Sequence, residues 1–186
     1  NKPTQDGLYL HFKQIATQVD LPIILYNIPG RSGVNMAPET IARLAGDFKN
    51  IIGVKEAAGS IPQASKILQL CGMDFLVLSG EDALNFPLLA VGARGFISVT
   101  ANIAPKDVAS VYNLFSAGEF EKAKDMHYKL LPLNEALFIE TNPIPIKAAL
   151  SMMDKIKYEY RLPLSEMTEA HYQELKNTIS DYGLIK

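Results

Sequence analysis

The stretch 51–57, IIGVKEA, places a lysine at the end of a short run of apolar residues. The run is typical of a buried β-strand, because β-branched residues dominate it. A lysine is almost never fully buried unless its charge has a partner. We therefore expect Lys55 either to extend its ammonium into water or to use its amine in chemistry.

Other runs of the same kind follow a regular order along the chain. With 50–54, the stretches 22–26, 75–78 and 95–99 are mainly apolar and alternate little, as strands buried on both faces of a parallel sheet do. Helical patterns lie before, between and after them, with Ser60 as a cap and Gly72 as an end signal for one of them. The expected helices cover 4–19, 38–46, 60–72, 82–91, 119–138, 144–153 and 168–182.

This order predicts an α/β protein with a parallel sheet. The βα units could form an open doubly wound sheet or half of a (β/α)8 barrel. The glycines do not space as a G-x-G-x-x-G nucleotide motif. A complete barrel typically needs about 250 residues, and the chain has 186, beginning inside a loop-like stretch at Asn1. We prefer the C-terminal half of a (β/α)8 TIM barrel at 1–118, followed by a helical region at 119–186.

Composition argues against several classes of function. The net charge of −2 gives no electrostatic reason to bind nucleic acid or a membrane surface. The apolar runs are too short for the roughly 18 residues of a spanning helix. A single cysteine, Cys71, rules out an internal disulfide and fits a reducing compartment. The histidines lack the spacing of metal ligands, so we expect no metal site.

Residues at the C-terminal ends of the strands are the candidates for catalysis in such folds. Lys55 could be a strand-end lysine that reaches water, or a nucleophile, because desolvation favours the neutral amine that attacks a carbonyl. Tyr26 could be a packing residue or a proton relay beside that amine. Neighbouring strands lie about 4.8 Å apart, so the two side chains could meet. Glu56 should point to the opposite face.

Two further positions have both a structural and a functional interpretation. Arg31, in the loop PGRSG, could be a solvated loop residue or a clamp for a carboxylate, which guanidinium binds through two hydrogen bonds. Gly80 could be a turn or packing glycine, or could let the backbone approach a ligand.

Four motifs together resemble those of a known family. They are YNIPGRSG (26–33), GVKEAAG (53–59), SGEDALNFPLLAVGARGFISVTAN (79–102) and NPIPIKAAL (142–150). The chain resembles, over its whole length, the dihydrodipicolinate synthases, also called 4-hydroxy-tetrahydrodipicolinate synthases, of the pyruvate-dependent class I aldolase superfamily. The resemblance implies a (β/α)8 barrel with a C-terminal helical region, a homotetramer, and a cytoplasmic enzyme of lysine and diaminopimelate biosynthesis without a metal or organic cofactor.

The resemblance also implies roles for individual residues. Lys55 matches the lysine that forms a Schiff base with pyruvate, and Tyr26 matches the tyrosine that moves protons around the imine. Arg31 matches the arginine that meets the carboxylate of the second substrate, L-aspartate 4-semialdehyde. Ile97 matches a position whose backbone lines the pyruvate pocket, and Gly80 one whose backbone faces the substrate.

Some family features have no counterpart in these residues. A relay threonine, a second relay tyrosine and the region expected to carry feedback control by lysine would all precede Asn1. AAG follows Lys55 where alanine-threonine-glycine is more usual, and serine follows Arg31 where threonine is common. We expect half a barrel alone to aggregate and to be inactive, because its sheet edges would be unpaired.

Other functions remain open at this point. N-acetylneuraminate lyase and the keto-deoxy sugar acid aldolases share the lysine and the tyrosine but seldom an arginine like Arg31. A non-catalytic barrel relative that binds a metabolite is the alternative from a different class, and the presence of both Tyr26 and Lys55 speaks against it.

Overall fold

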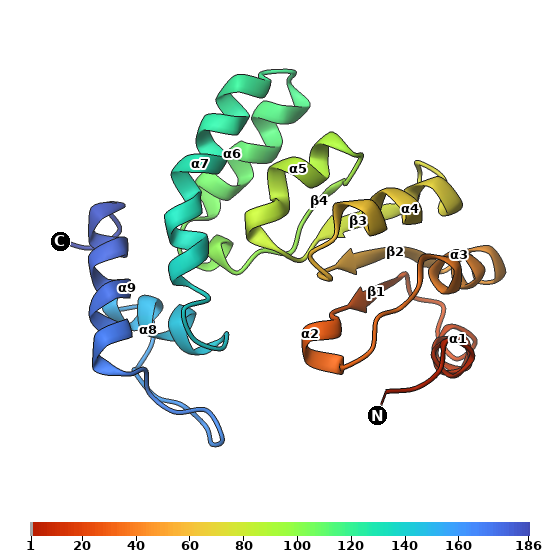
Figure 1. Ribbon diagram of the computed structural model, residues 1–186, viewed down its shortest axis with the longest axis horizontal. Helices are drawn as coiled ribbons and strands as arrows, with labels where there is room; N and C mark the ends of the chain where they lie inside the picture. The colour runs from red at the N-terminus through yellow and green to blue at the C-terminus, as the bar shows by residue number, and fades with distance from the viewer. Residues whose placement is uncertain (1) are drawn as a thin grey trace. The chain divides into compact units, whose positions relative to one another are not determined.

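The computed structural model describes residues 2–186 and divides them between two compact units, Asn1–Ile97 and Ser98–Lys186 (Figure 1). The first unit contains the parallel sheet and the second is helical. Within the described residues, no helix has both the length and the apolar character needed to cross a membrane.

The sheet contains the strands that the sequence predicts. They are β1 (Ile23–Asn27), β2 (Ile51–Glu56), β3 (Leu76–Ser79) and β4 (Gly95–Phe96), paired in parallel in the order β1-β2-β3-β4. The predicted α/β class with a parallel sheet is therefore confirmed. Strand β2 runs further than expected, and Lys55 and Glu56 are its last residues.

Strand β4 differs from the expectation of 95–99, because only Gly95 and Phe96 pair with β3. Beyond it the chain turns into the 3-10 helix η2 (Thr100–Asn102). The hydroxyl of Ser98 accepts a hydrogen bond from the backbone N–H of Ala101 at 2.9 Å, which favours a turn over an extended strand.

The first unit contains helices at the places that the sequence predicts, and the helix expected at 60–72 has the predicted caps. These helices are α1 (Gln5–Ala16), α3 (Pro38–Asp47), α4 (Ile61–Cys71) and α5 (Asn85–Ala90). The Ser60 side chain accepts a hydrogen bond from Gln63 N–H, and Gly72 ends the same helix. The expected helix at 82–91 is split into the 3-10 helix η1 (Asp82–Leu84) and α5. A short helix that the sequence analysis did not predict, α2 (Pro29–Ser32), follows β1.

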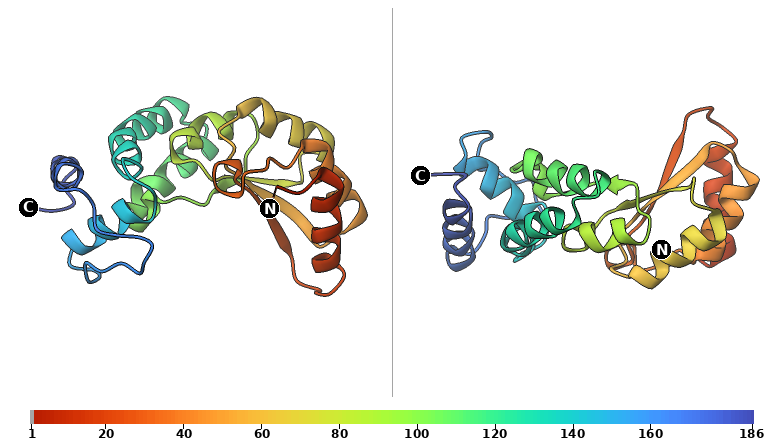
Figure 2. Two further views of the ribbon diagram at one scale, coloured as in Figure 1. Left: turned by 60° about the horizontal axis from the view of Figure 1, so that its bottom comes forward. Right: turned by 90° about the horizontal axis from the view of Figure 1, so that it is seen from above.

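The helices α1, α3 and α4 lie along one face of the sheet (Figures 1 and 2). Leu25, Val54 and Val77 are paired in register across three strands and are almost completely buried on that face. On the other face Ile24 is 41% exposed and Tyr26 is 46% exposed. The expectation of burial on both faces is thus wrong for this chain, because the helices cover one face only.

The second unit consists of η2 and the helices α6 (Pro105–Ser116), α7 (Phe120–Ala136), α8 (Ile144–Met152) and α9 (Glu169–Asp181). The three helices predicted beyond residue 118 are therefore present. The boundary between the two compact units falls after Ile97, whereas residue 118 lies between α6 and α7. The boundary between barrel and helical region at 118 therefore stays a prediction.

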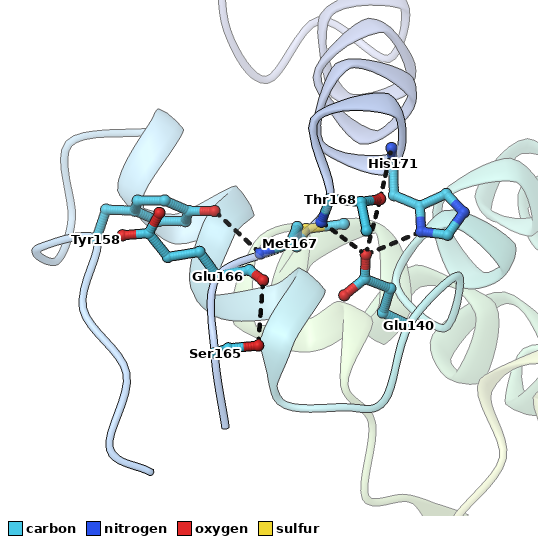
Figure 3. Close-up of polar contacts among 7 residues, drawn as sticks. All are labelled: Glu140, Tyr158, Ser165, Glu166, Met167, Thr168 and His171. Atoms are coloured by element: carbon cyan, nitrogen blue, oxygen red, sulfur yellow. Dashed lines mark hydrogen bonds and ion pairs between the residues drawn. The ribbon is translucent and has the colours of Figure 1, made fainter. Parts of the chain in front are cut away.

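Glu140, in the segment after α7, holds the start of α9 (Figure 3). One of its carboxylate oxygens accepts a hydrogen bond from Thr168 N–H at 3.0 Å and lies 2.8 Å from His171 Nδ1. Burial opposes ionisation of Glu140, but the hydrogen bonds from His171 and Thr168 outweigh it and lower the pKa of this carboxyl group. A negative charge at a helix N-terminus is favourable, so Glu140 stabilises the position of α9.

Tyr182 holds the other end of α9. Its hydroxyl donates a hydrogen bond to Asp107 of α6, and Lys129 of α7 donates to the same carboxylate oxygen at 2.9 Å. The hydrogen bonds from Tyr182 and Lys129 lower the pKa of Asp107. This contact therefore stabilises the folded state most when Asp107 is ionised.

Tyr182→Phe is expected to lower the free energy of unfolding by about 1.5 kcal/mol at neutral pH, because a hydrogen bond to a charged group is lost. Since the pKa of folded Asp107 is lowered, its stabilisation is present above the unfolded pKa of about 3.9 and disappears as pH falls through the folded value. Urea unfolding at pH 7 and pH 3 measures this. Tyr128→Phe, at a 61% exposed position, is the control. Equal losses at the two pH values would contradict the prediction.

Candidate functional site

Tyr26 and Lys55 occupy paired positions at the C-terminal ends of β1 and β2. Parallel pairing directs both side chains to the face that the helices leave uncovered. Lys55 Nζ lies 4.1 Å from the centroid of the Tyr26 ring. The prediction that these two side chains meet is confirmed, and their chemical roles remain predictions.

The amine lies over the face of the phenol ring. Such a cation–π contact is worth about 0.5–1 kcal/mol at an exposed site. Within residues 2–186, neither Lys55 Nζ nor Tyr26 Oη makes a hydrogen bond, and Lys55 forms no ion pair. Among the residues that the structure describes, the amine thus has the Tyr26 ring as a contact and no hydrogen bond or ion pair to break before it reacts. A proton relay through Tyr26 would need its hydroxyl to turn toward the amine.

Gly80 lies directly against Lys55. A Cβ atom at this position would be 2.9 Å from Lys55 Cε, 3.1 Å from Lys55 Cγ and 2.8 Å from the Cβ of Ala57. The backbone N–H of Gly80 also donates to Glu56 O at 2.8 Å, which continues the β2–β3 pairing beyond the strands. The absence of a side chain at Gly80 thus provides the space that the Lys55 side chain fills.

Ile97 lies at the edge of this group, and Arg31 belongs to a different element of the first unit. The backbone N–H of Ile97 donates to Ser79 O at 2.8 Å, so this residue adjoins the end of β3 next to Gly80, and its side chain is 43% exposed. Arg31 belongs to α2, which ends at Gly33 in the left-handed conformation, and is exposed. The structure brings together Lys55, Tyr26 and Gly80, and the contributions predicted for Ile97 and Arg31 remain predictions.

Two buried polar residues behind this pair were not selected by the sequence analysis as site residues. Asn27 and Glu56 are each 2% exposed and lie on the helix-covered face. The alternation of side chains along a strand could have indicated them. Asn27 lies two residues after the buried Leu25, and Glu56 two residues after the buried Val54, so each points to the same face as its buried neighbour. A polar residue at a core position of a strand needs hydrogen-bond partners.

A cavity of about 430 Å³ opens beside Tyr26, between α1, β1 and the segment before α3. Its lining includes His11, Phe12 and Met36 but not Lys55. The cavity thus adjoins Tyr26 but is not lined by the lysine.

The fold and the site define an α/β protein in which a lysine and a tyrosine meet at the C-terminal edge of a parallel sheet. The sequence model of the Dihydrodipicolinate synthetase family matches residues 1–182. The chain belongs to the Dihydrodipicolinate synthetase family.

Known proteins similar to this chain agree with that membership. The 4-hydroxy-tetrahydrodipicolinate synthase of Thermodesulfovibrio yellowstonii is 54% identical over 186 residues, which are 100% of this chain and 64% of the relative. The dihydrodipicolinate synthase structure from Thermotoga maritima superposes with a TM-score of 0.97 at 47% identity, covering 100% of this chain and 64% of that one.

A third comparison is with the chloride-inhibited dihydrodipicolinate synthase of Acinetobacter baumannii in complex with pyruvate. It has a TM-score of 0.95 and 44% identity, over 100% of this chain and 63% of that one. The chain thus spans slightly less than two thirds of the length of these relatives.

Proposed function

We propose that this chain is part of a 4-hydroxy-tetrahydrodipicolinate synthase, which condenses pyruvate with L-aspartate 4-semialdehyde through a Schiff base on Lys55. The observation that carries the proposal is the Lys55 amine at the end of β2, 4.1 Å from the Tyr26 ring centroid and without a charged partner among residues 2–186. Family membership and the names of the similar proteins support it.

The proposal also states which part of the complete barrel this chain forms. The four parallel strands with helices on one face form the C-terminal half of a (β/α)8 barrel at 1–118, and the helical region follows at 119–186. The exposure of Ile24 and Tyr26 on the open sheet face supports this, because the inner face of a complete barrel is filled by side chains from the other strands.

The first half of the reaction is the capture of pyruvate. The neutral amine of Lys55 attacks the ketone carbon, and a water molecule leaves as the imine forms. Tyr26 supplies the proton that the departing oxygen needs. The backbone of Gly80 faces the bound pyruvate beside the lysine, and the backbone at Ile97 lines the same pocket.

The second half is carbon–carbon bond formation. The imine loses a proton from the methyl group to the Tyr26 relay and becomes an enamine. The enamine carbon attacks the aldehyde of L-aspartate 4-semialdehyde, and the aldehyde oxygen takes up the proton from that relay as the iminium is restored. Arg31 meets the carboxylate of that substrate with its guanidinium group. The substrate amine then attacks the imine carbon, which closes the ring and releases Lys55. The protonated imine is the electron sink, so these steps use no metal or organic cofactor.

The full-length protein, in this proposal, is a cytoplasmic homotetramer that serves lysine and diaminopimelate biosynthesis. The named relatives support the pathway, and the tetramer is testable by light scattering.

A coupled assay with two aldehydes tests the substrate assignment. The full-length protein is expected to condense pyruvate with L-aspartate 4-semialdehyde at least about 100-fold faster than with N-acetylmannosamine, because Arg31 is suited to a carboxylate. Product is measured by coupling to NADPH oxidation for the first aldehyde and by chromatography for the second. Condensation with the sugar aldehyde alone would assign the protein to the sugar acid lyases instead.

A further inference from the structure

We propose that Glu56 is a positioning residue for Lys55: its buried carboxylate fixes the ends of β1 and β2 from behind the sheet, so that the lysine amine stays opposite Tyr26. This inference rests on the proposed function, because positioning matters only if Lys55 reacts. The structure supports it through burial, hydrogen bonding and connectivity.

Burial separates Glu56 from the reacting face. It follows Lys55 directly in β2, and successive strand residues point to opposite faces. Glu56 is 2% exposed and contacts the helix-covered side, whereas Lys55 contacts Tyr26 on the open side. No ion pair with Glu56 occurs in the described part of the chain. A buried carboxylate without a cation is costly unless N–H groups surround it.

Glu56 has such a set of donors. Oε1 accepts from the backbone N–H of Ala58 at 2.7 Å and from Asn27 Nδ2 at 3.2 Å. Oε2 accepts from Asn27 Nδ2 at 3.0 Å and from Gln63 Nε2 at 3.1 Å. Both oxygens therefore face donors only, which matches a carboxylate and leaves no acceptor for a carboxylic acid O–H.

The orientations of the two amides are fixed by their other contacts. Asn27 Oδ1 accepts from Met36 N–H at 2.9 Å, so Asn27 must present its NH₂ group to Glu56. Asn35 Oδ1 accepts from Asn27 Nδ2 at 2.8 Å, which sets the orientation of Asn35. Asn35 Nδ2 then donates to Gln63 Oε1 at 2.7 Å, so Gln63 also presents its NH₂ group to Glu56. The network thus specifies an acceptor with two oxygens at position 56.

Connectivity explains how this network acts on the site. Asn27 directly follows Tyr26, and Ala58 lies in the loop after Lys55, so one carboxylate joins the two strand ends that carry the reacting pair. The backbone oxygen of Glu56 also accepts from Gly80 N–H at 2.8 Å. The Glu56 side chain thus joins the residue after Tyr26 to the loop after Lys55, and its backbone holds Gly80, which lies against the lysine side chain.

The decisive variant is Glu56→Gln in the full-length protein. Either orientation of the new amide places an NH₂ group against N–H donors, so the two strand ends must shift. At saturating pyruvate we expect the rate of imine formation to fall about 10- to 100-fold, because small displacements of a reacting group cost this much. The reaction is quenched with borohydride at set times. Mass spectrometry then gives the fraction of the Lys55 peptide that carries the reduced pyruvate adduct at each time.

The controls separate positioning from stability. Glu174→Gln, at an exposed position in α9, should leave the rate unchanged. Glu56→Asp keeps a two-oxygen acceptor and should recover part of the rate that Glu56→Gln loses. Thermal unfolding and far-UV spectra give the folded fraction of each variant. If Glu56→Gln does not fold, Gln63→Ala removes one donor, keeps the carboxylate, and is expected to slow imine formation several-fold.

The outcomes distinguish this inference from the function on which it rests. A wild-type protein without a pyruvate adduct on Lys55 would overturn both. A wild-type adduct together with an unchanged rate in folded Glu56→Gln would overturn the positioning role and leave the function standing. A rate loss that is fully explained by unfolded protein would show that Glu56 is only structural. A slower rate per folded molecule, with partial recovery in Glu56→Asp, supports the inference.

Discussion

Lys55→Arg is expected to abolish the pyruvate adduct and to lower turnover of the full-length protein by at least about 10³-fold. Arginine stays protonated at any working pH, so it offers no neutral amine to attack the ketone. It also keeps the positive charge and can stack on Tyr26 as lysine does at 4.1 Å. The loss would therefore reflect chemistry rather than unfolding.

Borohydride reduction in the presence of pyruvate, followed by mass mapping, measures the adduct directly. Lys66→Arg is the matched control, because Lys66 is an exposed lysine of α4 whose amine donates to Gln69 at 3.0 Å. The wild type and this control should both carry the adduct on the peptide with Lys55. Full turnover in Lys55→Arg would refute the proposed mechanism, and a wild type without any adduct would favour a metabolite-binding relative.

Much of the first unit follows from local pattern in the sequence. The runs that lead to Tyr26 and Lys55 are apolar and β-branched, and the helices between strands have caps such as Ser60 and ends such as Gly72. Parallel strands with their C-terminal ends at one edge then bring Tyr26 and Lys55 together without any further information. The contact could be predicted because it depends on strand order and on both side chains ending their strands in the same register.

The parts that were missed depend on distant residues. Glu56 meets Asn27 and Gln63, 29 and 7 residues away along the chain, and the Asn35–Gln63 pair spans 28 residues. A single sequence gives no sign of which polar groups will complete such a network. The four residues of α2 are too few for helical periodicity to show. The exposure of Ile24 depends on which distant parts of the protein cover that face of the sheet. A local sequence pattern does not contain this information.

Gly80→Ala is expected to reduce turnover about 100-fold while it changes stability by only about 1–3 kcal/mol. The added Cβ would lie 2.9 Å from Lys55 Cε and 2.8 Å from the Cβ of Ala57. The backbone at Gly80 is not in the left-handed region, so the conflict is steric. The lysine side chain is flexible and can swing away, whereas the Cβ of Ala57 moves only with its backbone, so the cost in stability comes from Ala57. The movement of the lysine takes the amine from its place over Tyr26.

Gly46→Ala is the control for this change, because a Cβ at Gly46 in α3 would meet nothing within 4 Å. Alanine is a better helix former than glycine, so the control should keep full turnover and gain up to about 1 kcal/mol of stability. Urea unfolding and steady-state kinetics on both variants compare the two effects. Normal turnover in Gly80→Ala would mean that the amine works from a different place than the one beside Gly80. A collapse of the fold instead would mean that Ala57, rather than the flexible lysine, takes up the clash.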